Sequence, residues 1–338
     1  MSIGEGQVMK SGSDKVGVSS EAASADFIAS ATELVSRTAN LFSAEKGVYV
    51  LMIGTTQLLF NLFADLIFFS FYPLMRPLYT ATIGIDPFSL LTSSLNLIGL
   101  PNTYVIWNLA LTAAGIAVFA VLGGGAIKYA LCNYRSSSKG SMRESLSFAA
   151  DRAVTLITTQ LVVAFLIFLT VSPIVFALLG GLIVLYPIRP YAYLGALVNI
   201  MPILLMCLFV TAYISVRFAP VQAVVVAEGL NALNSIKRAW ELTSGNSWHA
   251  FKGIFLLMMI LGPIAVAMSF LALMLYFGVS MWTTIIPAAI NQLFLSPLVY
   301  VFGAVLYQDL GARKAAQAGD WWNRAVERTN GSEDSVVP

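Results

Sequence analysis

The sequence predicts an all-α polytopic integral membrane protein with six transmembrane helices, and three observations support this fold class. Of the 338 residues, 58% are hydrophobic and 11% are charged, whereas about 25% of the residues in a soluble domain are charged. The apolar residues form six runs, each long enough to cross a hydrocarbon core that needs about 20 residues. Lys and Arg gather between alternate runs. Most of this chain therefore requires lipid as its solvent.

Two segments of different character precede the first apolar run. Residues 1–24 are rich in Ser, Gly and charge and hold no apolar block that could serve as the core of a signal peptide, so we expect a disordered cytoplasmic tail. From Asp26 to Phe42, apolar residues recur at helical spacing opposite polar ones, which predicts an amphipathic helix. It leads directly into the first span, at about 48–74.

Two further amphipathic helices are predicted, at 141–156 before the third span and at 231–243 before the fifth. A short surface helix is expected over 88–98. Prolines interrupt the last four spans and are tolerated only where neighbours satisfy the freed carbonyl groups, so we expect these helices to be kinked and packed together. The second to sixth spans are predicted at about 104–130, 155–186, 191–217, 251–277 and 281–310.

The positions of the basic residues predict the orientation of the chain. Seventeen of the 19 Lys and Arg lie in the tails or in the loops after the second and fourth spans, which leaves Arg76 and Arg189 for the opposite side. Because positive charge accumulates in cytoplasmic loops, both termini and all three amphipathic helices are expected on the cytoplasmic side of the cell membrane. Residues 311–338 are expected to form a cytoplasmic tail with a short interfacial helix.

An internal repeat predicts how the membrane domain, residues 25–310, is organised. A shift of 90 residues places Ser145 on Ser235 and Ala149 on Ala239, so an amphipathic helix followed by a hairpin is used at least twice. The first helix and hairpin follow the same order without matching residues, and we expect a third copy. The three units are then about 25–131, 141–218 and 230–310.

The segment Glu228–Gly253 is a charged island between two long apolar runs. As a helix over 231–243, it places Leu233, Ile236 and Trp240 on one face and its charged residues on the other. Such a pattern is typical of an interfacial helix rather than a spanning one.

A tight turn is expected at the end of this helix. Gly245 can adopt the left-handed conformation at no steric cost and direct the chain into the fifth span. Trp240 and Trp248 lie where indole rings favour the headgroup level. We prefer an anchoring turn to a ligand-binding role. The residues of this interfacial elbow are Lys237, Arg238, Trp240, Gly245, Asn246 and Trp248.

The stretch Ser235–Asn246, SIKRAWELTSGN, resembles the membrane domain fused to some bacterial glycerophosphoryl diester phosphodiesterases and its stand-alone relatives, including archaeal families without assigned function. The match is best over Ala239–Asn246, where Ala239 stands at a position usually occupied by Ser. The resemblance implies an architecture over about 25–310. The chemistry of the fused relatives resembles the work of a separate barrel domain with a metal, for which this chain has no room. We therefore expect no enzyme activity, cofactor or metal.

Three polar residues lie four apart in the first span: Gln57, Asn61 and Asp65. A carboxylate deep in a membrane is costly unless it is neutralised, hydrogen-bonded or hydrated, so Asp65 marks a candidate site. One alternative is a protonated Asp65 that ties the first span to Asn291 or Gln292 in the sixth. The other is an ion or substrate path along this stripe.

Other reactive residues favour no chemistry. The sole histidine, His249, is expected to be an interfacial ring rather than a metal ligand or catalyst. Cys132 and Cys207 are predicted at different depths and should not pair. Glu228 is expected to cap a helix or lie on a solvated face.

The expected function is that of a non-enzymatic membrane scaffold or lipid-interface module. The alternative is a small-molecule or ion transporter that uses the polar stripe. The expected partner is the lipid bilayer, with other membrane proteins as further candidates. A nucleic-acid partner is not expected, because the formal net charge is only +2 and the basic residues are scattered.

Overall fold

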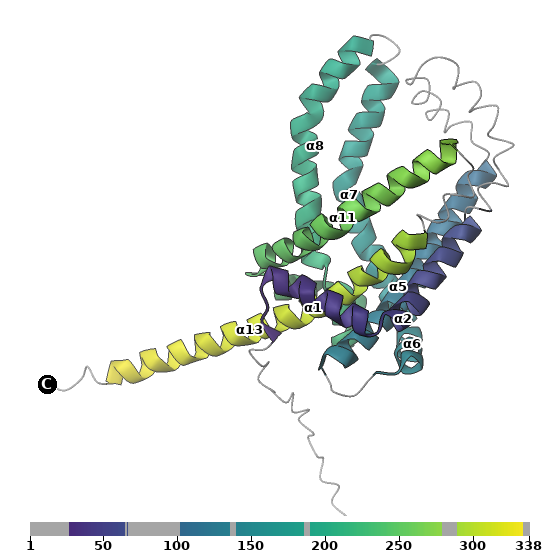
Figure 1. Cartoon of the computed structure of the whole chain (residues 1–338). Coiled ribbons are helices and arrows are strands. Elements are labelled where there is room, and N and C mark those ends of the chain that lie inside the picture. The colour runs from purple at the N-terminus through teal and green to yellow at the C-terminus, as the bar shows by residue number, and fades with distance from the viewer. Residues whose placement is uncertain are drawn as a thin grey trace, which may run out of the picture. The chain divides into compact units, whose positions relative to one another are not determined.

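The computed structural model describes residues 27–64, 66, 102–135, 140–185, 190–278 and 289–333, and every regular element in these ranges is a helix (Figure 1). The chain divides into two compact units, Ala29–Leu310 and a smaller unit of Met1–Ile28 with Gly311–Pro338. Six of the described helices are long and apolar enough to cross a membrane, which indicates a membrane protein. Residues 1–24, Asp65 and the helix predicted over 88–98 lie outside the described residues.

The helices of the second to fifth spans begin and end close to the predicted limits. The first span starts with α2 (Lys46–Tyr49), passes through the π-helix η2 (Val50–Thr55) and remains helical to residue 64. A short helix, α9 (Val221–Glu228), follows the fourth span. The second to fifth spans are α5 (Asn102–Arg135), α7 (Ala153–Leu185), α8 (Pro190–Phe218) and α11 (Ser247–Gly278). The sixth span contains the π-helix η5 (Asn291–Leu295) and continues as α13 (Ser296–Glu333).

The C-terminal helix differs from its prediction. The sequence predicted a separate short helix in residues 311–338, whereas α13 continues without a break from Ser296 to Glu333. The segment after Gly311 is rich in Ala, Lys, Arg and Gln, which are strong helix formers, and it holds no proline that would end the helix.

Three short helices precede the hairpins, namely α1 (Ala31–Ala44), α6 (Met142–Asp151) and α10 (Ala232–Thr243). Each has an N-cap side chain that accepts a hydrogen bond from the backbone N–H three residues on. In each helix, the fourth and eighth residues after the cap are buried. The caps with these buried residues are Ser30 with Leu34 and Thr38, Ser141 with Ser145 and Ala149, and Asn231 with Ser235 and Ala239.

The cap of α1 sets its first residue. The sequence placed the start of this helix near Asp26, but Ser30 and Glu33 form a reciprocal capping box, and the helix begins at Ala31. The Glu33 carboxylate also accepts a hydrogen bond from Arg37 Nε at 3.0 Å. This bond, followed by the one from the Ser30 backbone, lowers the pKa of the Glu33 carboxyl below its usual value.

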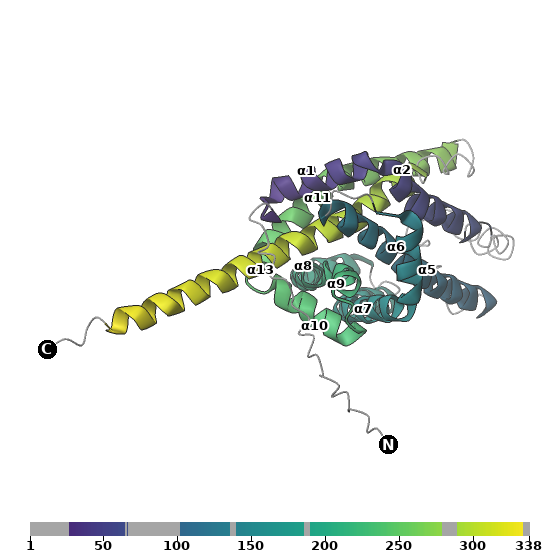
Figure 2. The ribbon, with the colours of Figure 1, turned by 90° about the horizontal axis from the view of Figure 1, so that it is seen from below.

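We call α1, α6 and α10 together the collar, because they lie around the ends of the spans when the molecule is seen from below (Figure 2). Helix α6 packs on α5, α10 packs on α7, α8 and α9, and α1 packs on α11. Each collar helix that follows a hairpin therefore packs on that hairpin, and α1 packs on the last one. Much of the buried core of the described residues comes from α5, α9 and α13, as with Ala126, Val225 and Val305.

Candidate functional site

The interfacial elbow has the backbone that the sequence predicted. Asn231 Oδ1 accepts the Asn234 N–H at 3.0 Å, and α10 runs from Ala232 to Thr243. Gly245 has a φ of 82°, the left-handed conformation expected there. Asn246 is buried, and α11 begins at the next residue. The predicted turn at Gly245 is confirmed.

Helix α10 has a buried face of small residues that the sequence analysis did not separate from its apolar face. Ser235 and Ala239 are buried against the protein, whereas the Leu233 side chain is 72% exposed and Trp240 is also exposed. Ile236 lies between these faces and is partly buried against the core. Small residues permit close packing on one side, while Leu233 and Trp240 present apolar surface outward.

Some charged residues of the elbow form ion pairs within the protein. Arg238 Nε lies 3.1 Å from Glu228 Oε2, and Glu228 Oε1 accepts a hydrogen bond from Tyr307 at 3.0 Å. Glu228 thereby links α9, α10 and α13, a role that the sequence analysis missed. Lys237 is exposed, and Glu241 Oε2 lies 3.7 Å from Arg238 Nη1.

Two aromatic rings contact a second cation, Arg217 at the end of α8, which packs against the elbow. The Arg217 guanidinium lies 4.7 Å from the centroid of the Trp240 ring and 5.0 Å from that of Tyr213. Trp248 is 66% exposed and stacks on Phe251 at 5.2 Å. Large apolar rings and basic groups thus share the outer surface of the elbow, as at a lipid headgroup layer.

The intramembrane polar residues meet where two π-helices touch. η2 packs on η5, and a Cβ atom added to Gly54 would lie 2.7 Å from Leu293 Cα. One turn farther along, Ser296 Oγ donates a hydrogen bond to Gln57 Oε1. Single-turn π-helices are frequent at functional sites. The first and sixth spans are therefore joined through a hydrogen bond between Gln57 and Ser296, which the sequence analysis did not predict.

The remaining residues of the predicted stripe are only partly placed. Asn291 and Gln292 lie in η5, and their side-chain oxygens Oδ1 and Oε1 are buried without a hydrogen-bond partner in the described structure. Asn61 is half-buried on the first span, and Asp65 lies outside the described residues. The predicted link from Asp65 to Asn291 or Gln292 stays a prediction.

A buried carboxylate that the sequence analysis missed joins three elements. Asp309 is 1% exposed, and its Oδ1 accepts the Ala29 N–H at 2.8 Å. Its Oδ2 lies 3.0 Å from His249 Nε2, which is ion-pair distance, although the alignment is not that of a hydrogen bond. His249 is thus a partner of Asp309 rather than a free interfacial ring. Asn133 acts similarly, because its Oδ1 accepts the Gly140 N–H just before the cap of α6 at 2.7 Å.

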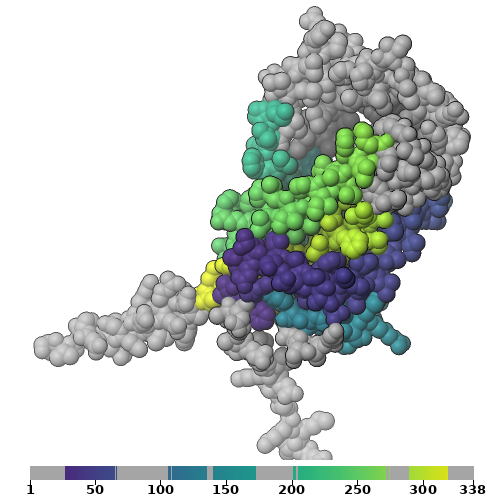
Figure 3. All heavy atoms as spheres, viewed as in Figure 1, coloured from purple at the N-terminus to yellow at the C-terminus, as the bar shows by residue number. Residues whose placement is uncertain are grey.

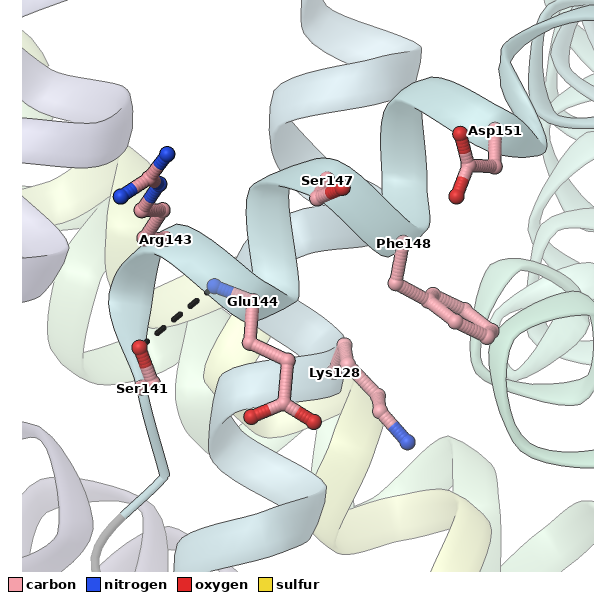
Figure 4. A pocket seen from close by; sticks show the side chains of 7 residues that line it. All are labelled: Lys128, Ser141, Arg143, Glu144, Ser147, Phe148 and Asp151. Carbon is pink, nitrogen blue, oxygen red and sulfur yellow. Dashed lines mark hydrogen bonds between the residues drawn. The ribbon is translucent and has the colours of Figure 1, made fainter.

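A shallow hollow of about 480 Å³ lies between α5 and α6 (Figure 4). Lys128 Nζ lies 4.8 Å from the centroid of the Phe148 ring. Because the lining carries both signs of charge, it does not favour an anion or a cation. The lining residues are Lys128, Ser141, Arg143, Glu144, Ser147, Phe148 and Asp151.

Comparison of the chain with protein-family models, with curated proteins and with solved structures finds no match. Within the described ranges, no three His, Cys, Asp or Glu side chains come together as metal ligands would. Cys132 and Cys207 form no disulfide bond with each other. The arrangement of the site is therefore interpreted from its own contacts.

Proposed function

We propose that this protein is a non-enzymatic integral membrane scaffold whose collar lies in the headgroup layer and organises lipid around the bundle. The observation that carries this proposal is the outward apolar surface of the elbow. Leu233 and Trp248 are exposed beside the basic residues Lys237 and Lys252. In water such rings and aliphatic groups would be costly, whereas an interface accepts both the apolar and the basic groups.

The collar supports a three-unit architecture. We infer that α1, α6 and α10 with their following hairpins are three copies of one unit, because the same two positions after each cap are buried. Each hairpin pairs within itself through contacts of η2 with α5, α7 with α8 and α11 with η5. The distribution of Lys and Arg supports a cytoplasmic collar. The resemblance of Ser235–Asn246 to membrane domains without their own chemistry favours the same architecture.

A non-enzymatic role is favoured because two carboxylates beside the collar, Asp309 of α13 and Glu228 of α9, are engaged in structural contacts. Asp309 holds Ala29 and His249, and Glu228 holds Arg238 and Tyr307. A carboxylate committed to two neighbours is poorly placed to act as a general base on a substrate. The partner that we propose is the lipid bilayer.

Spin-labelled phosphatidylcholine in proteoliposomes tests this function. We expect the wild-type protein to hold a motionally restricted lipid population, and the double variant Leu233→Ser/Trp248→Ser to hold a smaller one. The matched control is Asn234→Ser on the polar side of the same helix, which should behave as wild type. An equal restricted population in the double variant, with unchanged helicity by circular dichroism, would contradict the proposal.

A transporter is the second candidate, and the contact between the two π-helices favours it. Polar oxygens of Asn291 and Gln292 lie buried in η5 near the Gln57–Ser296 bond. Unwound helix segments with free oxygens are a common way to bind ions in membranes. An ion flux into proteoliposomes that Gln57→Leu abolishes would support transport, and no flux above protein-free vesicles would count against it.

A further inference from the structure

An apolar cavity of about 350 Å³ lies between α8, α11 and α13, within the range of roughly 300–1,000 Å³ that ligand sites occupy. Its walls include Val216 from α8, Phe251 and Met258 from α11, and Phe302 from α13, and Ser215 is the only polar residue among the described residues that line it. The C-terminal end of α8 packs near the N-terminal part of α11, and the two helices diverge away from this contact (Figure 1). The cavity therefore lies where two spans separate along their length.

A cation is fixed on the same turn of α8 that lines this cavity. Arg217 follows the lining residue Val216, and its Nη2 donates to the Tyr213 hydroxyl at 2.7 Å. Its Nη1 lies 3.5 Å from the Thr243 hydroxyl, and Trp240 covers its face. Among the residues that the structure describes, no carboxylate oxygen lies within 4.0 Å of this guanidinium. Its positive charge is held in place by neutral groups.

We propose that this site binds one glycerophospholipid, with its phosphodiester at Arg217 and an acyl chain in the cavity. A guanidinium held by neutral groups complements a phosphate, and a cavity with almost no polar group suits a hydrocarbon chain. Trp240 lies beside Arg217, at the level where indole rings contact headgroups. The inference rests on the proposed lipid-interface function and adds a specific partner to it.

Native mass spectrometry of the full-length, delipidated protein tests the headgroup contact. Phosphatidylglycerol is compared with diacylglycerol that carries the same two chains. We expect the wild-type protein to bind phosphatidylglycerol about tenfold more tightly, since a charge-assisted contact contributes roughly that factor. Arg217→Gln should remove this preference. Lys46→Gln, which removes an exposed charge from the start of α2, should keep it.

The cavity is tested by filling it. A Cβ atom at Gly303 would lie 4.0 Å from Ala219 O, so Gly303→Leu can extend into the space and should weaken the binding of both lipids several-fold. Ser215→Phe fills the same cavity from α8 and provides a second variant if the first does not elute as wild type in size-exclusion chromatography.

Three results would overturn the inference. They are equal affinity of the wild-type protein for the two lipids, unchanged preference in Arg217→Gln, and a change of oligomeric state in the folded cavity variants, which would identify a second copy of the chain as the occupant. If the binding of phosphatidylglycerol is absent while the restricted lipid population remains, this site fails and the general lipid-interface function stands. Loss of the restricted population would contradict that function instead.

Discussion

The fifth and sixth spans use their apolar residues in opposite ways. Helix α11 contains the most apolar stretch of the six, yet only 6% of that stretch is buried inside the protein, and its face is visible in Figure 3. The sixth span, Asn291–Ala318, is among the least apolar, yet 56% of its stretch is buried. In a soluble protein the order would be reversed.

The difference between these spans shows what hydropathy reports in this chain. Lipid is as apolar as a leucine side chain, so apolar residues have no need to be inside, and helices associate through close packing and polar contacts. The sixth span carries Gln308 and Asp309 in its buried part, whereas α11 exposes residues such as Phe255 and Val266. In these two spans, the higher hydropathy goes with the more exposed helix.

The largest effect is expected where the sixth span meets the first. In Gly54→Leu, the new side chain would meet the backbone of Leu293, so η2 and η5 must separate. We expect a loss of stability above the ~1–3 kcal/mol usual for overpacking, because the obstacle is backbone. Gly262→Ala in α11 is the matched control, since nothing lies within 4 Å of its added Cβ. Gly262→Ala should leave the melting temperature unchanged or raise it. Equal losses of stability in both variants would contradict the difference in packing between the sixth span and α11.

Removal of the Asp309 carboxylate should have the next largest effect. Asp309→Ala leaves the Ala29 N–H without its acceptor and His249 without its partner, and we expect it to lower the free energy of unfolding by roughly 3 kcal/mol. Asp309→Asn retains an acceptor oxygen and should lose less. Unfolding in mixed detergent, followed by tryptophan fluorescence, measures both variants. Identical stability of Asp309→Ala and wild type would mean that this carboxylate does not hold the start of α1 and α11 to the sixth span.

Two valines allow the same substitution to be compared at a buried and at an exposed position. Val305 in the sixth span is 1% exposed, and Val266 in α11 is 69% exposed. Val305→Ala should cost about 1–2 kcal/mol through lost packing contacts, whereas Val266→Ala should stay within about 0.5 kcal/mol of wild type. The same unfolding measurement applies. A larger loss at Val266 would show that a partner or a second copy covers α11.

The smallest effect is expected in the collar, where the rules for soluble helices should apply. Asn231→Ala removes the side chain that accepts the Asn234 N–H and should cost about 1 kcal/mol. Asn231→Ser, which keeps a capping oxygen, is the control and should remain near wild type. If both variants have the same melting temperature, the cap does not stabilise α10.

Much of the fold could be predicted from the sequence because lipid imposes long apolar runs. The limits of α7, α8 and α11 lie within a few residues of prediction, and α10 was predicted to begin at Asn231, the residue that caps it. The partners of polar groups could not be predicted. Which carboxylate joins which helix depends on contacts far apart in the chain, such as Asp309 with Ala29.

The candidate site was predicted less completely than the fold. The turn at Gly245 followed from local backbone preference, which the sequence carries directly. The pairing of Gln57 with Ser296 did not, because a serine in an apolar run gives no signal of what it faces. A lone polar residue at the end of an apolar run, as at Asn133 and Asp309, is the signal that could have identified the buried links.

The central claim is that exposed apolar groups of the collar contact lipid, and neighbouring spin labels test it most directly. Labels are placed at Leu233→Cys and Asn234→Cys in a Cys132→Ser/Cys207→Ser background, in proteoliposomes. Both positions are exposed, and the account predicts that the label at 233 is accessible to oxygen while the label at 234 is accessible to a water-soluble nickel chelate. Equal access of the chelate to both labels would place the whole of α10 in water and contradict the account.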